Sequence, residues 1–67
     1  MAIRKIGEII AMHRRLRGLS QAVVARAAGR SQVWVSQVEL GKIRPGDVQL
    51  RKIERILDVP LREGAAE

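Results

Sequence analysis

The chain has 67 residues, a net charge of +6, no cysteine and a single aromatic residue, a tryptophan. This length predicts one domain, residues 1–67, and the absence of thiols excludes disulfides and thiolate metal sites. No apolar run approaches the roughly 18 residues of a membrane-spanning helix, so we expect no membrane contact.

The first predicted element is an amphipathic helix over residues 3–17 that ends at Gly18. Without Phe or Tyr, the core has to be built from aliphatic side chains, which is feasible in a small helical bundle. One face of this helix carries Ile6 and Ile10. An adjoining side stripe carries Ile9, Met12 and Leu16.

Residues 20–39 predict two short helices joined by a tight turn. Ser20 is a good N-cap for a helix that ends near residue 28, and Gly29 can take the positive φ that often follows a helix end. The second of these helices should begin after Arg30 or Ser31 and end near Leu40. Because Ser31 has a hydroxyl next to the first helical turn, it is the better N-cap.

The apolar spacing within this segment is typical of a helix-turn-helix. Ala25 provides the small side chain that two closely crossing helices need, and Gly29 provides the turn. Val35 and Val38, three residues apart, form the inward pair of the second helix. A unit of this kind lays its second helix in the major groove of DNA, so the spacing predicts a DNA-binding module.

A basic loop and a fourth helix complete the predicted bundle. Residues 42–46 are rich in turn formers, and either Gly46 or Asp47 can cap the helix that follows. Pro60 marks a break, and residues 61–65 could form one last turn. The apolar stripe of the fourth helix is expected at Leu50, Ile53, Ile56 and Leu57. We therefore predict an all-α fold, a compact bundle of four to five helices.

Charge and side-chain chemistry predict which residues contact DNA. Residues 1–46 hold nine Lys or Arg against two Glu, whereas residues 47–67 hold four basic against five acidic residues. The positive excess therefore coincides with the helix-turn-helix, as an electrostatic footprint for phosphates requires. Amide side chains can pair with adenine, and a valine can contact a thymine methyl. The expected base readers are Gln32, Val33, Ser36 and Gln37.

Phosphate contacts are expected around the same helix. Cations at both of its ends can grip the backbone on either side of a groove, and the first turn of the preceding helix presents free N–H groups to an anion. The indole N–H of the tryptophan could reach a phosphate, and packing of its ring in the core is the alternative. The expected phosphate contacts are Gln21, Arg30, Ser31, Trp34, Lys42 and Arg44.

Taken together, these residues resemble the phage Cro/repressor-type (XRE-type) helix-turn-helix family. The matching pieces are Ile6-Gly7-Glu8, Arg14, Gly18-Leu19-Ser20-Gln21, Ala25, Ala28-Gly29, Ser31, Val35-Ser36, Glu39, Gly41-Lys42, Pro45, Leu50, Ile53, Leu57 and Val59-Pro60-Leu61. The resemblance implies a lambda-repressor-like fold and a partly buried ion pair between Arg14 and Glu39. Because residues 1–7 carry no signal-peptide core and no run is long enough to span a membrane, we expect a cytoplasmic protein of prokaryotic or phage origin. His13, where relatives have an apolar residue, and Gly46-Asp47, where they often have Ser-Leu, depart from the pattern.

The sequence thus predicts a sequence-specific transcriptional regulator, a repressor that needs no catalysis, cofactor or metal. Because one such module reads only about 4 to 6 base pairs, we expect a homodimer on palindromic double-stranded DNA. The expected dimer interface is Ile56, Leu57, Val59 and Leu61. The alternative is a protein-interaction module, such as the antitoxin of a toxin–antitoxin pair. Its partner would bind the side stripe Ile9, Met12 and Leu16, and its DNA binding would serve autoregulation.

Overall fold

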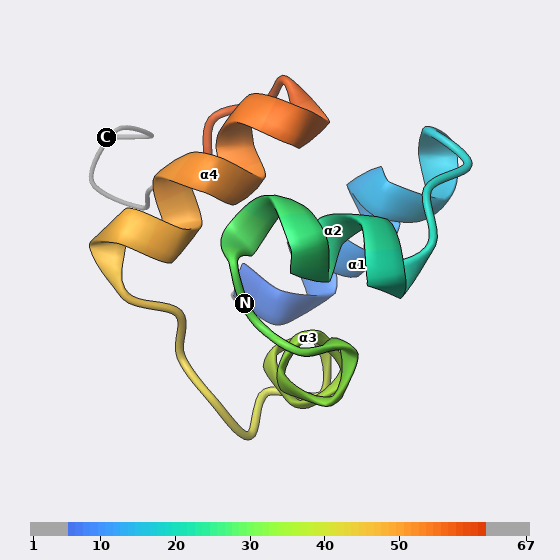
Figure 1. Ribbon diagram of the computed structural model, residues 1–67. Helices are drawn as coiled ribbons and strands as arrows, with labels where there is room; N and C mark the ends of the chain where they lie inside the picture. The colour runs from blue at the N-terminus through green and yellow to red at the C-terminus, as the bar shows by residue number, and fades with distance from the viewer. Residues whose placement is uncertain (1–5, 62–67) are drawn as a thin grey trace, which may run out of the picture.

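The computed structural model describes residues 6–61, which form four helices and, within that range, no strand (Figure 1). In chain order these are α1 (Ile6–Leu16), α2 (Gln21–Ala28), α3 (Gln32–Glu39) and α4 (Asp47–Leu57). The predicted all-α bundle is confirmed. The first three residues of the helix expected over 3–17, and all but residue 61 of the expected last turn, lie outside the described residues.

The turn chemistry sets the helix ends in the middle of the chain as the sequence predicts. The hydroxyl oxygen of Ser20 accepts the N–H of Val23 at 3.2 Å, and that of Ser31 accepts the N–H of Trp34 at 3.1 Å. Gly29 takes a left-handed φ of 70° directly after α2, where a residue without a Cβ is under no strain. Of the two possible caps for α4, Gly46 holds the position, without a side-chain hydrogen bond.

The core lies where all four helices meet. Both α1 and α2 pack against α3 and against α4, so α3 and α4 lie at opposite sides of the molecule, with α3 seen end-on in Figure 1. The largest side chains that are fully buried are all aliphatic, Trp34 is the one aromatic core residue at 8% exposure, and one residue from the segment after α4 joins the core. The buried core residues are Ile10, Val24, Ala25, Ala28, Trp34, Val35, Val38, Leu50, Ile53, Leu57 and Leu61.

One glycine decides how closely α1 approaches α3. Gly7 is buried inside α1, and a Cβ at this position would lie 1.9 Å from the carbonyl oxygen of Val38. Any side chain would therefore push the two helices apart. The sequence interpretation missed this contact, although a glycine inside an amphipathic helix pattern is itself a signal of close backbone approach.

Candidate DNA-binding surface

The inward residues of α3 determine which side of the helix faces solvent. Val35 and Val38 are each 1% exposed in the core, so the opposite side of the helix points outward. Gln32 and Val33 are exposed there, Val33 to 66%. With them on one outer face lie two partly exposed residues, Ser36 and Gln37. All four expected base readers thus share one continuous surface, in which Val33 is an apolar spot between polar neighbours.

The chain on either side of α3 carries the expected cations. Arg30 precedes the helix and is exposed, and its guanidinium carbon lies 5.3 Å from the centre of the Trp34 ring. A cation held over an aromatic face gains about 0.5–1 kcal/mol at an exposed site, which favours one orientation of Arg30. Trp34 itself is only 8% exposed, so packing accounts for its position. After α3, Lys42 and Arg44 are both exposed.

The turn after α3 determines the direction in which the chain that carries Lys42 and Arg44 leaves the helix. Gly41 has a left-handed φ of 82°, and the N–H of Lys42 donates to the carbonyl of Gln37 at 2.9 Å. The backbone therefore reverses directly at the helix end, in a left-handed C-terminal motif. As a result, Lys42 is held beside the last turn of α3. Arg44 lies further along the loop to α4, in a small hollow lined also by Asp47 and Leu61.

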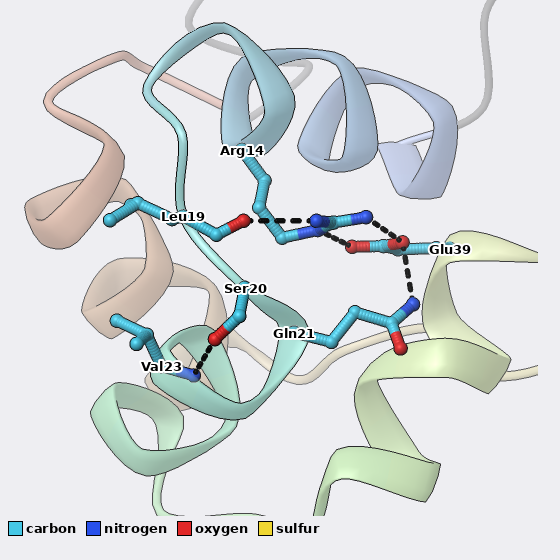
Figure 2. Close-up of polar contacts among 6 residues, drawn as sticks. All are labelled: Arg14, Leu19, Ser20, Gln21, Val23 and Glu39. Atoms are coloured by element: carbon cyan, nitrogen blue, oxygen red, sulfur yellow. Dashed lines mark hydrogen bonds and ion pairs between the residues drawn. The ribbon is translucent and has the colours of Figure 1, made fainter.

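Beneath this surface, a polar network joins α1, the start of α2 and the end of α3 (Figure 2). Arg14 donates to Glu39 through Nε at 2.7 Å and through Nη2 at 3.1 Å, forming a bidentate ion pair. Its Nη1 donates to the carbonyl of Leu19 at 3.0 Å, in the loop between the first two helices. The side chains of Arg14 and Glu39 are 12% and 6% exposed, so water screens the pair only weakly.

Gln21 is the third member of this network. Its Nε2 donates to Oε1 of Glu39 at 2.9 Å, which orients the amide at the first residue of α2. From the sequence we expected only a phosphate contact at Gln21 and did not foresee this hydrogen bond. The amide retains a second donor hydrogen, and the first-turn N–H groups of α2 lack helical partners. The hydrogen bond therefore leaves the expected phosphate role open.

The network keeps both members of the ion pair charged. Burial alone would raise the pKa of Glu39, but hydrogen bonds from Arg14 and Gln21, with the charges of Arg14 and Arg15, more than offset it and leave that pKa below its usual value. The hydrogen bond to Glu39 raises the pKa of Arg14, against the opposing effect of burial. The ion pair is therefore maintained at neutral pH.

Two residues of the expected dimer interface do not lie on the surface. Leu57 is 0% and Leu61 4% exposed within a single chain, and the N–H of Leu61 donates to a carboxylate oxygen of Glu54 at 2.7 Å. This hydrogen bond ties the segment after α4 back onto the helix. The expectation that both leucines contact a second copy is therefore corrected, because the core of one chain already uses them. Ile56 and Val59 are partly exposed beside the core.

These features define a class of domain: two short helices, α2 and α3, cross closely through a glycine turn and present the outer face of the second. Such a helix-turn-helix is a DNA-binding unit. The family model described as a helix-turn-helix domain matches residues 5–66, and the chain belongs to this family. Among curated proteins, none matches the chain significantly. None of the described helices has the length and apolar character needed to cross a membrane.

Proposed function

We propose that the protein is a sequence-specific transcriptional regulator of the Cro/repressor type, which represses by binding a palindromic operator as a homodimer. The observation that carries this proposal is the outer face of α3, where Gln32, Val33, Ser36 and Gln37 lie together. Two amides that can pair with adenine and a valine that can meet a thymine methyl favour a site containing A·T pairs.

Binding divides into two kinds of contact in this proposal. Arg30, Lys42 and Arg44 contact phosphates at both ends of α3 and supply affinity that depends on salt. Gln21 adds an amide donor at the first turn of α2, and the hydroxyl of Ser31 can still donate while it caps α3. The base contacts then supply the preference for one sequence over another.

The homodimer follows from the size of the footprint. One recognition helix contacts about one half-site, so two copies with their α3 helices roughly 34 Å apart are needed on adjacent turns of the duplex. Ile56 and Val59 remain candidates for the contact between copies, since both are partly exposed. Sedimentation at rising concentration, with and without a palindromic duplex, tests this part. A protein that stays monomeric on the palindrome would contradict it.

Selection of bound sites from random duplexes tests the proposal as a whole. The selected sites should be palindromic, with half-sites about 10 base pairs apart from centre to centre. With the selected duplex, Gln32→Ala or Gln37→Ala should cost roughly 1 to 3 kcal/mol, while binding to a random duplex changes little. If the glutamine substitutions weakened binding to both duplexes alike, the assignment of base readers would be wrong.

A matched pair of arginines separates phosphate contacts from general charge. Arg44→Ala should weaken binding to selected and random duplexes alike and lower the salt slope by about 1. Arg51→Ala removes the same charge from an exposed position of α4, a helix on the other side of the molecule from α3 (Figure 1). Equal loss of slope in both variants would mean that only the net charge matters.

A second candidate function is a protein-interaction module, such as an antitoxin that regulates its own gene. Two of the three residues expected to contact a partner, Met12 and Leu16, are exposed to 38% and 75%, whereas Ile9 packs against the core. Exposed apolar side chains on a small monomer favour such a role. Selection of DNA sites does not by itself separate the two functions, because an antitoxin that regulates its own gene also binds an operator. A protein partner that loses binding to a Leu16→Ser variant would favour the second function.

A further inference from the structure

A hollow lies between the second half of α1 and the last turn of α3. Its volume is about 740 Å³, it opens to solvent on one side, and residues from Glu8 to Leu16 of α1 line one wall. At a rise of about 1.5 Å per residue, this wall is roughly 12 Å long. A helix of about two turns fits along it.

The surface of the hollow is unusually apolar for this protein. Among the described residues, six large hydrophobic side chains are exposed, and three of them line the hollow: Met12 at 38%, Leu16 at 75% and Leu40 at 66%. Buried Ala11 contributes a small apolar floor. The stripe that the sequence indicated on α1 is therefore extended by Leu40, which directly follows α3. A cluster of this kind is typical of a surface that another protein covers.

The charges of the hollow select the kind of partner. The carboxylate of Glu39 faces it but is neutralised by the bidentate contact with Arg14. Arg15 lines the hollow at its rim and Arg17 follows the apolar wall, whereas Glu8 is the one other acidic residue among those that line the hollow. The chain as a whole carries +6. Arg14, Arg15 and Arg17 together outnumber Glu8 and Glu39 by one, so the region is only slightly positive, and it is mainly the charge of the whole chain that favours an acidic occupant.

We infer that the hollow binds an acidic amphipathic helix of another protein, and that this helix and DNA exclude each other. The apolar side of the helix would cover Met12, Leu16 and Leu40, as in other helix-in-groove contacts. Exclusion follows because Gln21 and Ser36 line the hollow and also belong to the proposed DNA surface. An occupant that touches both occupies space that the duplex needs. This second part rests on the proposed function.

The test is a selection of helical peptides from a randomised display library on the purified protein, followed by affinity measurement with fluorescent peptides. The expected winners carry apolar residues at helical spacing together with Asp or Glu. Leu16→Ser should weaken their binding at least tenfold, and Arg15→Glu should weaken it in a salt-dependent manner. Val48→Ser is the matched control, because Val48 is exposed to 59% on α4 and does not line the hollow.

Several outcomes decide the inference. No enriched peptide, or winners that bind wild type and Leu16→Ser equally well, would overturn it. The selected duplex should displace the peptide from wild type, and Leu16→Ser should bind that duplex normally. Simultaneous binding of peptide and duplex would overturn the exclusion. If wild type selected no duplex at all, the proposed function would fail, while the Leu16-dependent peptide result would stand by itself.

Discussion

Replacement of Gly7 by alanine tests whether close contact between α1 and α3 holds the fold together. Alanine is the best helix former, and a glycine in a helix interior costs about 0.8–1 kcal/mol relative to it. From propensity alone, Gly7→Ala should therefore stabilise the protein. The structure predicts the opposite sign, because the new Cβ would lie 1.9 Å from the carbonyl oxygen of Val38 and 3.0 Å from Cα of Glu39.

The expected loss can be worked from these distances. Ordinary contact begins near 3.4 Å, so the difference from 1.9 Å requires the helices to separate by about 1.5 Å. The obstructing atom belongs to the backbone and cannot rotate away. Overpacking of a core costs about 1–3 kcal/mol, and the shift would also lengthen the contacts of Glu39 with Arg14. After the gain in propensity of about 1 kcal/mol, a net loss of up to about 2 kcal/mol remains.

Urea unfolding followed by the fluorescence of Trp34 measures this change, since the buried ring becomes exposed on unfolding. Gly18→Ala is the matched control. Gly18 has a φ of 68°, and nothing lies within 4 Å of the position that a Cβ would take, so its substitution carries only the strain of the left-handed backbone, about 1 kcal/mol. A Gly7→Ala protein as stable as wild type, or more stable, would refute the claim that close packing of α1 against α3 requires a glycine at position 7.

The remaining predictions concern the ion pair, a cap and the C-terminal segment. Glu39→Ala should cost about 3 kcal/mol in urea unfolding, because it leaves Arg14 charged in a site with little water. A double-mutant cycle with zero coupling would mean independent charges. Since the pKa of Glu39 is lowered in the fold, its stabilisation should be full above the unfolded value and be lost as pH falls below about 4.5, a loss absent from Glu39→Gln. Ser31→Ala should cost about 1 kcal/mol through the lost cap, and Ser31→Gly only a few tenths. Leu61→Asp should unfold more readily than wild type in thermal melts, because Leu61 is a core residue, whereas a surface role would leave the melt unchanged.

The features that follow from local chemistry could be predicted from the sequence. Ser20, Gly29 and Ser31 each have a backbone preference that applies wherever such residues stand, and the helix ends fall there. The inward valines of α3 follow from the helical period, and so does its outer face. The pairing of Arg14 with Glu39 needed more than local chemistry, and it came from resemblance to a family, not from spacing.

The features that the sequence did not predict depend on contacts between segments far apart in the chain. Gly7 touches the backbone of Val38 in another helix, and no local pattern specifies that distance. The hydrogen bond from Gln21 to Glu39 was not predicted, because no local pattern brings these two residues together. Leu57 and Leu61 were expected on the surface because α4 and the segment after it have more apolar residues than one layer needs. The segment after α4 turns back onto the helix, so the additional apolar side chain of Leu61 is buried in the core of the same chain.

Under the proposed function, the network that stabilises the fold also includes a DNA-contacting residue, Gln21. Glu39 ends α3, Gln21 begins α2 and Arg14 comes from α1, so a single network sets the relative positions of the three helices. In a chain of 67 residues, whose total stability is of the order of 3–10 kcal/mol, the loss of that network removes a large part of the folding free energy. It also releases the amide at the first turn of α2 from its orientation. Under the proposed function, variants of Glu39 should therefore lose operator affinity even under conditions in which they remain folded, because α3 and the first turn of α2 are then no longer held in one fixed geometry.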